Sequence, residues 1–462
     1  MFIKKSRVTA SLLIFSISAY AQPSGRPLMN GPPPEARQAC ADRGDGDSCG
    51  FKAPHGQIDG VCRVVPEGRV CVPSDQSRQR MSNSRMQVSA DDGRSMQSGS
   101  PFGAEIAGTN PEAIRVRSKL PDTHQGSCFD DQKVIPCPKQ GQPYYGQDAQ
   151  YLGAEPNYTV YSNEMVQDHV TGLIWQKAHN PIRLDWYSAR QTCSNLRLGG
   201  FQDWRLPSIR ELFSIADFRG SVGRRPYLDN VFEIREPDAS VLEGDRFAQT
   251  HRTEMMGQTW SSTLYTGDHW GRKGVEAAFF MNFLDGHIKQ APTRGGQKLF
   301  YRCVRGSVWG TNDYVDNKNG TVTDRASGLM WQQSDDGVKR DWPGALSYCS
   351  NQRYAGYEDW RLPNIKELQS IVDYTRHDPA IDERFLRQSD RNAWFWSSTT
   401  HGDNVRQADY ICFGKCTSIG SVDVHGAGAQ RSDPKRRGLI HRQSQGGQND
   451  EIRIDNFVRC VR

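Results

Sequence analysis

The sequence lacks long apolar stretches. Beyond residue 21, no segment stays apolar for the roughly 18 residues that a membrane-spanning helix needs. Hydrophobic residues make up 36% of the 462 residues, and the mean hydropathy is −0.72. This composition excludes a polytopic membrane protein and indicates a polar chain with disordered stretches.

The chain also carries little net charge. The formal charge is +5, but Lys4, Lys5 and Arg7 lie in a segment that we expect to be removed. Taking these three from the +5 leaves +2. An excess this small does not argue for a nucleic acid as partner.

Several sequence signatures of enzymes are missing as well. The sequence contains no Gly-rich phosphate loop, no His-Glu-x-x-His and no Gly-x-Ser-x-Gly. Their absence argues against a P-loop nucleotide-binding enzyme, a zincin-type metalloprotease and an α/β-hydrolase. We therefore expect no cofactor.

The N-terminus has the pattern of a secretory signal peptide. A basic start is followed by an apolar run from Val8 to Tyr20 and by the small-x-small triplet that ends at Ala21. We expect residues 1–21 to be removed before Gln22. No cysteine follows this site, so a lipoprotein anchor is not indicated. The mature protein is expected in the periplasm, on the cell surface or in the medium.

Twelve cysteines in an exported chain predict disulfides. Four of them, Cys40, Cys49, Cys62 and Cys71, lie within residues 37–73, a span too small for a proper hydrophobic core. Their spacing does not match Cys-x-x-Cys zinc pairs. We expect a module with two disulfides, and three connectivities remain open.

The segments around this module read as connections. Residues 22–36 are a Pro-rich linker. Residues 74–127 are rich in Ser, Gln, Arg, Asp and Gly, with a single aromatic residue, and predict a disordered tether. Residues 128–155 form a lead-in in which Cys128 and Cys137 are close enough in sequence for a local disulfide.

From residue 156 onward the chain is a tandem duplication. Five short sequence motifs, which we call words, occur twice in the same order: 171–176 at 327–332, 185–193 at 341–349, 203–207 at 359–363, 260–263 at 396–399, and 302–305 at 459–462. The first three recur after 156 residues, the fourth after 136 and the last after 157. The words that keep register are scaffold, and the stretches that absorb insertions are surface loops. The repeats are residues 156–306 and 307–462.

Each repeat predicts an α+β domain. A short strand covers 173–175 (329–331), and a helix follows Asp185 (Asp341) as N-cap. A second helix begins with Pro207 (Pro363) at its first position. Two later strands flank an Asp-Gly hairpin turn at 285–286, and a final strand covers 301–304 or 457–461.

A long-range disulfide is expected in each repeat. Cys193 and Cys303 are 110 residues apart, and Cys349 and Cys460 are 111 apart. Each pair would join the first helix to the last strand. Closing a loop of this length stabilises a fold by about 4 to 5 kcal/mol in the chain-entropy account.

The repeated words resemble the Lcl C-terminal domain family of bacterial exported proteins. The words are Gly-Leu-Met-Trp-Gln (328–332), Asp-Trp-Arg-Leu-Pro-Asn (359–364), Trp-Ser-Ser-Thr (396–399) and Arg-Cys-Val-Arg (459–462). Two helices, a late antiparallel sheet and a helix-to-strand disulfide also resemble the C-type lectin-like fold. The resemblance implies two tandem C-type lectin-like domains and an adhesin role toward glycans, sulfated glycosaminoglycans among them. The collagen-like tract of the family's founding adhesin is missing here, so a trimer is not supported.

The repeated words themselves favour structural roles. Trp204 and Trp360 are expected in the core, and the arginine after each is expected to pair with Glu211 or Glu367. The Trp-Ser-Ser-Thr words lie where calcium-dependent lectins of this fold carry a Trp-Asn-Asp motif. Calcium prefers carboxylate ligands, so we expect no metal site there.

The loops that differ between the repeats are better candidates for binding. In repeat 1, Trp270 stands beside Arg272 and Lys273, and a tryptophan can stack on a sugar while cations hold its anionic groups. The alternative is a solvated loop with scattered charges.

The insertion of repeat 2 is the second candidate. It contains a basic run that is typical of sites for polyanions. We expect this run to be an exposed loop and the main contact for an anionic glycan. Its candidate residues are Arg431, Lys435, Arg436, Arg437 and Arg442.

Two alternatives to an adhesin-like glycan-binding protein remain. Formylglycine-generating enzymes share the fold but need reactive cysteines. Cys412 and Cys416 are either such a pair or a local disulfide. The tandem domains could also bind a surface protein as a structural part of an envelope assembly. We expect a binding protein rather than an enzyme, and the oligomeric state stays open.

Overall fold

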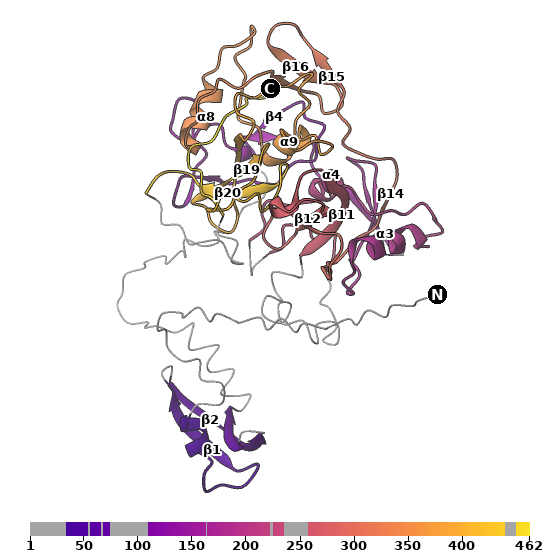
Figure 1. The fold of residues 1–462 in the computed structure, drawn as a ribbon. Helices are drawn as coiled ribbons and strands as arrows, with labels where there is room; N and C mark the ends of the chain where they lie inside the picture. Colours follow the sequence, from indigo (N-terminus) through magenta and orange to yellow (C-terminus); the bar gives the residue numbers. More distant parts are fainter. Residues whose placement is uncertain are drawn as a thin grey trace, which may run out of the picture. The chain divides into compact units, whose positions relative to one another are not determined.

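The computed structural model describes residues 34–53, 56–65, 68–73, 110–162, 164–221, 225–234, 257–438 and 450–462. The expected signal peptide, most of the Pro-rich linker and residues 74–109 of the expected tether lie outside this part of the chain. The chain divides into two compact units, Met1–Gln97 and Ser98–Arg462 (Figure 1). Among the described residues, no helix has both the length and the apolar character needed to cross a membrane.

The first unit is a small disulfide-rich sheet. Helix α1 (Pro34–Gln38) precedes the antiparallel strands β1 (Ser48–Ala53), β2 (Gly56–Val65) and β3 (Gly68–Pro73). Disulfides join Cys40 to Cys62 and Cys49 to Cys71, which selects one of the three connectivities. The four cysteines and Ala36 form the buried cluster of this unit, so the disulfides take the place of a larger hydrophobic core.

The second unit contains both repeats, and among the described residues three strands, two helices and three further strands follow in the same order in each; repeat 1 adds a 3₁₀ turn and a final short strand. Repeat 1 contains β8 (Tyr158–Tyr161), β9 (Met165–Asp168), β10 (Ile174–Gln176), α3 (Trp186–Asn195), α4 (Ile209–Ser214), β11 (Gln258–Tyr265), the 3₁₀ turn η2 (His269–Gly271), β12 (Ala277–Asn282), β13 (His287–Pro292) and β14 (Val304–Arg305). Repeat 2 contains β15 (Tyr314–Asp316), β16 (Thr321–Asp324), β17 (Leu329–Gln332), α8 (Trp342–Ser350), α9 (Ile365–Ser370), β18 (Trp394–Thr400), β19 (Gln407–Cys412) and β20 (Gln430–Pro434). The fold is mixed, with more strands than helices.

The two repeats share one antiparallel sheet. Its strand order is β11-β12-β13-β20-β19-β18, and the repeats meet where Ile288 of β13 pairs with Gln430 of β20. Equivalent strands of the two repeats therefore occupy matching positions on either side of the sheet's centre, which gives the unit a pseudo-twofold axis. One hydrophobic cluster contains side chains of both repeats, including Phe213 and Phe279 of repeat 1 and Leu368 and Phe395 of repeat 2.

The Trp-Ser-Ser-Thr words hold the second helix of each repeat. The register of β11 with β12 shifts between Trp260 and Leu264, and an equivalent shift occurs in repeat 2. Just beyond the tryptophan, Thr263 Oγ1 accepts a hydrogen bond from the backbone N–H of Ile209 at 3.0 Å. Thr399 does the same for Ile365 at 3.0 Å. These words are part of the scaffold.

Both second helices start later than the sequence predicts. Helix α4 begins at Ile209, and the Ser208 side chain accepts the N–H of Glu211 in a capping box. Helix α9 has the same arrangement with Asn364 as cap. The prediction that Pro207 occupies the first helical position is therefore wrong. The capping box makes Ser208, the residue after the proline, the N-cap, so the helix starts one residue after Ser208.

The arginine of each Asp-Trp-Arg-Leu-Pro word forms the expected ion pair. Arg361 donates to both carboxylate oxygens of Glu367 at 2.6 Å. Arg205 contacts Glu211 in the same way, at 2.7 and 2.6 Å. Each glutamate is also the third residue of its helix and closes the capping box. One bidentate pair therefore fixes the start of α4 or α9 against the preceding chain.

The long-range disulfides join Cys193 to Cys303 and Cys349 to Cys460, the pairing that the equal separations predict. The final strands are shorter than predicted. Repeat 1 keeps only β14, and residues 457–461 form single bridges rather than a strand. Here the guanidinium of Arg459 is buried and donates to the carbonyls of Gln332 and Gln333, both at 2.8 Å.

The prediction of a disordered tether up to residue 127 is wrong for residues 110–127. This stretch contains β4 (Ile114–Arg115), which pairs with β7 (Tyr151–Leu152), and continues into β5 (Cys128–Phe129), β6 (Val134–Ile135) and the 3₁₀ turn η1 (Asp148–Gln150). A disulfide between Cys128 and Cys137 closes the β5–β6 hairpin.

Polar contacts to the repeats order residues 110–155, which we call the lead-in from here on. Buried Gln125 accepts the N–H of Thr400 at 2.9 Å and donates to its carbonyl at 2.8 Å. Asp148 accepts from Thr123 at 2.9 Å and from Thr399 at 2.5 Å. A composition argument considers only how much apolar surface a segment can bury, so it misses a segment that is ordered by hydrogen bonds to its neighbours.

The two Arg–Glu pairs allow a matched stability test. The Arg361 side chain is 2% exposed, whereas the Arg205 side chain is 28% exposed. Glu367→Gln strands a buried guanidinium, and removing one partner of a buried pair costs about 3–5 kcal/mol. Glu211→Gln should cost clearly less, because water reaches Arg205. Urea unfolding of both variants measures the difference, and equal losses would contradict it.

Candidate functional site

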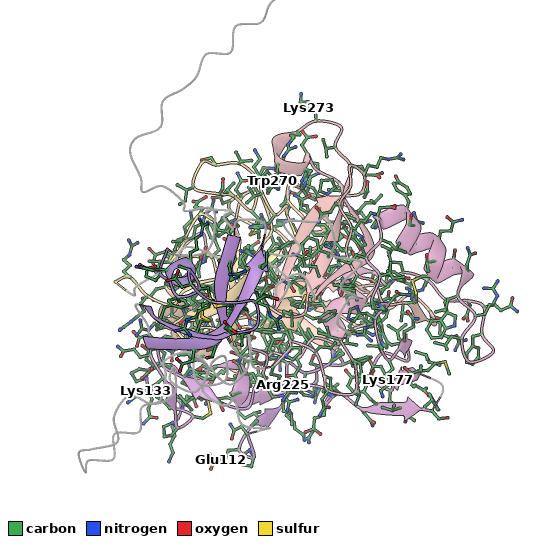
Figure 2. All side chains as sticks on the ribbon, turned by 90° about the horizontal axis from the view of Figure 1, so that it is seen from below. Glu112, Lys133, Lys177, Arg225, Trp270 and Lys273 are labelled. Atoms are coloured by element: carbon green, nitrogen blue, oxygen red, sulfur yellow. A yellow bond between two sulfur atoms is a disulfide. The ribbon has the colours of Figure 1, made fainter. Side chains whose placement is uncertain are left out.

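The Trp270 loop, residues 266–276, connects β11 to β12 and forms an exposed tip (Figure 2). Trp270 is 37% exposed and has a φ of 55°, a left-handed conformation that is uncommon for a residue other than glycine. His269 lies buried next to it, with ring centroids 5.8 Å apart. The turn therefore exposes the Trp270 ring at the surface, where it stacks on the buried ring of His269.

Two cations accompany this tryptophan. The Arg272 guanidinium lies 5.5 Å from the centre of the indole ring. Lys273 is exposed at the outer end of the loop (Figure 2). Burial lowers the pKa of His269, so this histidine is neutral at neutral pH. The structure thus brings together Trp270, Arg272 and Lys273, the three candidate residues of repeat 1.

The expectation of an exposed basic loop in repeat 2 is wrong for Arg431 and Lys435. Arg431 lies in β20, is 5% exposed and forms an ion pair with Asp450. Lys435 is fully buried, and its ammonium donates to the carbonyl of Asp130 at 3.0 Å and to Thr400 Oγ1 at 2.8 Å. Burial holds the pKa of Lys435 well below its usual value. Neither residue can contact a ligand at the surface.

The rest of the basic run is dispersed. Arg436 pairs with Asp131 of the lead-in, and Arg437 is exposed and pairs with Asp455. Arg442 lies outside the described residues. The duplication contained the signal that would have corrected this prediction: residues 430–434 follow their Trp-Ser-Ser word as a third strand, just as 287–292 do in repeat 1. Counting charges ignored that equivalence.

A buried histidine cluster lies where the repeats meet. His401, which follows β18, stacks between Tyr227 and His287 of repeat 1, with ring centroids 5.6 and 4.7 Å away. His401 Nδ1 lies 2.9 Å from Asp409, and its Nε2 lies 3.4 Å from Asp403. Sequence reasoning gave no sign of this cluster, because its members are dispersed over both repeats.

The cluster fits an ion pair better than a metal site. His287, His401 and Asp409 have ligand atoms within 4.8 Å of one another. However, the imidazole planes lie only 17° from parallel, so their lone pairs do not converge on one point. Burial alone would lower the pKa of His401, but Asp409 and Asp403 outweigh burial and raise it to about 10. The raised pKa favours the protonated imidazole at neutral pH, and this form has no lone pair for a metal ion.

A second group with metal-ligand potential is already neutralised. His124, Asp217 and Asp229 also have ligand atoms within 4.8 Å of one another. Asp217 is buried and accepts from Arg219 at 2.6 Å and from Arg225 at 2.5 Å. Two guanidinium groups occupy this carboxylate, so the arrangement is an ion-pair network.

The cysteine pair that an enzyme would need is a disulfide. Cys412 at the end of β19 is bonded to Cys416, and all twelve cysteines of the chain are paired. Both residues are buried. A formylglycine-generating mechanism that starts from a thiol at these positions lacks that thiol in this structure.

His401 predicts a specific pH dependence of stability. Its pKa is raised to about 10 in the folded chain, against about 6.5 in an unfolded chain. The protonated His401 therefore stabilises the folded chain fully below pH 6.5, and this stabilisation is lost as the pH rises through 10. We expect the difference in unfolding free energy between wild type and His401→Gln to shrink from pH 7 to pH 10, by on the order of 4 kcal/mol.

A second buried histidine provides the control for this test. Burial lowers the pKa of His425 to about 4, so His425 stays neutral over the whole range. His425→Gln should therefore differ from wild type by a constant amount between pH 7 and pH 10. Chemical denaturation at each pH measures both differences. A His401→Gln difference that is as flat as the His425→Gln difference would contradict the charged state of His401.

Comparison with known proteins gives one family. The model of the Lcl C-terminal domain matches residues 164–305 and 320–433, which together are more than half of the chain. A comparison with curated proteins finds no match. The two matched segments lie within the two repeats and contain the Asp-Trp-Arg-Leu-Pro and Trp-Ser-Ser-Thr words of each. The chain belongs to the Lcl C-terminal domain family, which it carries as two copies.

Proposed function

We propose that this chain is an exported binding protein that recognises anionic glycans through Trp270, Arg272 and Lys273. The observation that carries the proposal is the exposed tryptophan flanked by two cations on a projecting loop. An indole face stacks on the C–H face of a sugar ring, and guanidinium and ammonium groups bind carboxylate or sulfate.

The roles of the repeated words support a binding site in a loop. The Trp-Ser-Ser-Thr words hold helices, and the Asp-Trp-Arg-Leu-Pro arginines pair with buried glutamates. The terminal Arg-Cys-Val-Arg words supply a disulfide and an arginine that pairs with an aspartate, as Arg305 does with Asp203. Residues that maintain the scaffold are not free to bind a ligand. Recognition is then left to the loops, in which the two repeats differ.

The conformation of the loop is a second argument. Trp270 and Gly271 both have positive φ values, 55° and 67°. For tryptophan this conformation is strained, and strain of this kind gathers at ligand sites. Exposing an indole also forgoes the stabilisation that its burial would give. A loop shaped only by stability would bury this residue or replace it.

The setting fits an exported C-type lectin-like protein. Six disulfides are typical of chains that leave the cytosol, and the N-terminal sequence has the pattern of a signal peptide. Each repeat combines two helices with a late antiparallel sheet and a disulfide from the first helix to the end of the repeat, and we infer a C-type lectin-like fold from this resemblance as part of the proposal. We extend the glycan-binding role of that fold to this chain as part of the proposal.

Heparin chromatography tests this site. We expect Trp270→Ala and the double variant Arg272→Glu/Lys273→Glu to elute at clearly lower salt than wild type, because exposed ionic contacts are screened as salt rises. Their melting temperatures should stay near that of wild type, since changes in surface loops usually cost less than about 0.5 kcal/mol.

Two comparisons separate glycan recognition from general charge. Lys133→Glu/Lys139→Glu changes the net charge equally at exposed positions of the lead-in, and Lys133 lies far from Lys273 (Figure 2). This control should elute like wild type. On a sulfopropyl cation exchanger, Trp270→Ala should also elute like wild type. If Trp270→Ala keeps full retention on heparin, the proposed site is wrong.

A further inference from the structure

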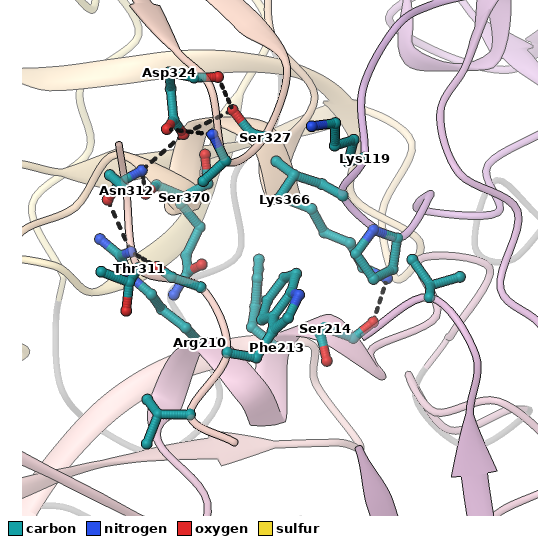
Figure 3. Close-up of a pocket in the computed structure, with 18 residues that line it drawn as sticks. Lys119, Arg210, Phe213, Ser214, Thr311, Asn312, Asp324, Ser327, Lys366 and Ser370 are labelled. Carbon is teal, nitrogen blue, oxygen red and sulfur yellow. Dashed lines mark hydrogen bonds between the residues drawn. The ribbon is translucent and has the colours of Figure 1, made fainter. Parts of the chain in front are cut away.

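A cavity of about 340 Å³ lies between helices α4 and α9 (Figure 3). Residues 119–121 of the lead-in and residues 308–312 at the start of repeat 2 also line it. Pockets for small molecules usually measure about 300–1,000 Å³, so this one suits a ligand of one ring. Val308 is 68% exposed and Lys119 is exposed, which places both at the mouth.

The cavity lies on the pseudo-twofold axis of the duplication. Four lining positions of repeat 1 return in the lining 156 residues later: Val170 as Ala326, Arg210 as Lys366, Phe213 as Gln369 and Ser214 as Ser370. Each repeat therefore contributes a cation from the same helical position. In Figure 3, Arg210 and Lys366 lie on opposite sides of the cavity.

Both cations keep hydrogen-bonding capacity for a ligand. The Lys366 ammonium is buried and donates to the carbonyls of Asp122 at 2.8 Å and Ser214 at 2.9 Å. An ammonium has three protons, so one remains. The Arg210 guanidinium donates to Gly310 and Val372 carbonyls and to Asn312 Oδ1. It has five N–H groups, so donors remain there too.

The negative charge of the lining is already engaged. Asp324 is the one carboxylate among the described lining residues, against the cations Lys119, Arg210 and Lys366. Its Oδ1 accepts two backbone N–H groups, from Asp313 and Ala326, and its Oδ2 accepts from Asn312 and Ser327. A cleft with an excess of one charge attracts the opposite charge.

We propose that this cavity binds a small organic anion, whose carboxylate lies between Arg210 and Lys366 and whose ring packs against Trp309. Trp309 lies half-buried in the wall, and its backbone N–H donates to Glu211 at 3.1 Å. Phe213, Leu120 and Pro121 add apolar surface. Burial lowers the pKa of Lys366 to about 8, although Asp122, Asp217, Asp168 and Asp148 all act to raise it.

This site is separate from the Trp270 loop and does not depend on the glycan proposal. The cavity is lined by the lead-in, α4, α9 and the start of repeat 2, whereas Trp270 lies between β11 and β12. A ligand in the cavity would contact all three parts of the second unit at once. Its binding should therefore raise the melting temperature as its concentration rises.

Calorimetric titration of the whole chain with two acids and their neutral counterparts tests the proposal. Glucuronate and glucose represent sugars, and benzoate and benzyl alcohol represent aromatic ligands without a sugar ring. We expect at least one acid to bind and to raise the melting temperature, and its neutral counterpart to do neither. The acid that binds more tightly shows whether the site prefers a sugar acid or an aromatic acid. If neither acid binds at 10 mM, or if the neutral compounds bind equally, the proposal is wrong.

Val308 at the mouth provides matched variants that should fold normally, because its side chain is exposed. Val308→Glu should weaken binding of the acid at least threefold by repulsion, and Val308→Lys should leave it unchanged or tighten it. Lys366→Met should abolish binding if the variant folds. Trp270→Ala should bind the acid like wild type, which separates this site from the glycan site. Equal affinities of Val308→Glu and Val308→Lys would place the acid outside the cavity.

Discussion

Charged groups buried where repeat 2 meets the lead-in and repeat 1 must find partners there, and this constraint shapes the second unit. An isolated charge inside a protein is so costly that it is paired, hydrogen-bonded or neutralised. The ammonium of Lys366 meets the constraint with one carbonyl from the lead-in, at Asp122, and one from repeat 1, at Ser214. Lys435 does so with the carbonyl of Asp130. Two lysines of repeat 2 thus need the lead-in as a source of acceptors, which makes this segment part of the fold.

The same constraint makes the duplicated unit asymmetric. The lead-in covers the Trp-Ser-Ser-Thr word of repeat 2, where Asp148 accepts from Thr399 and Gln125 holds the backbone of Thr400. Thr399 is fully buried, but its equivalent Thr263 is only half-buried. Likewise, Arg361 is buried while Arg205 reaches water. One copy of the repeat has become the inner, supported copy.

Sequence reasoning predicted the features that depend on local patterns or on the repeat itself. Equal separations predicted the disulfides Cys193–Cys303 and Cys349–Cys460. The repeated Asp-Trp-Arg-Leu-Pro motif, with a glutamate shortly after it, predicted the Arg205–Glu211 ion pair. It missed features that depend on contacts between distant segments. Residues 110–127 look like a tether because their order comes from hydrogen bonds to the repeats. Arg431 looks like part of a polyanion site because its partner, Asp450, lies beyond an intervening stretch of chain. The cavity needed both repeats in place before its lining existed.

The loop after β11 and the equivalent loop after β18 point in different directions. In repeat 2, the loop after β18 turns inward, and His401 stacks on Tyr227 and His287 of the other repeat. In repeat 1, the base of the equivalent loop also reaches across, since Tyr265 donates to Asp423 at 2.6 Å. Its tip, however, carries Trp270 outward. With the inward loop supplying the interface, the outward loop is free to vary, which is the condition under which a binding site can arise on a fixed scaffold.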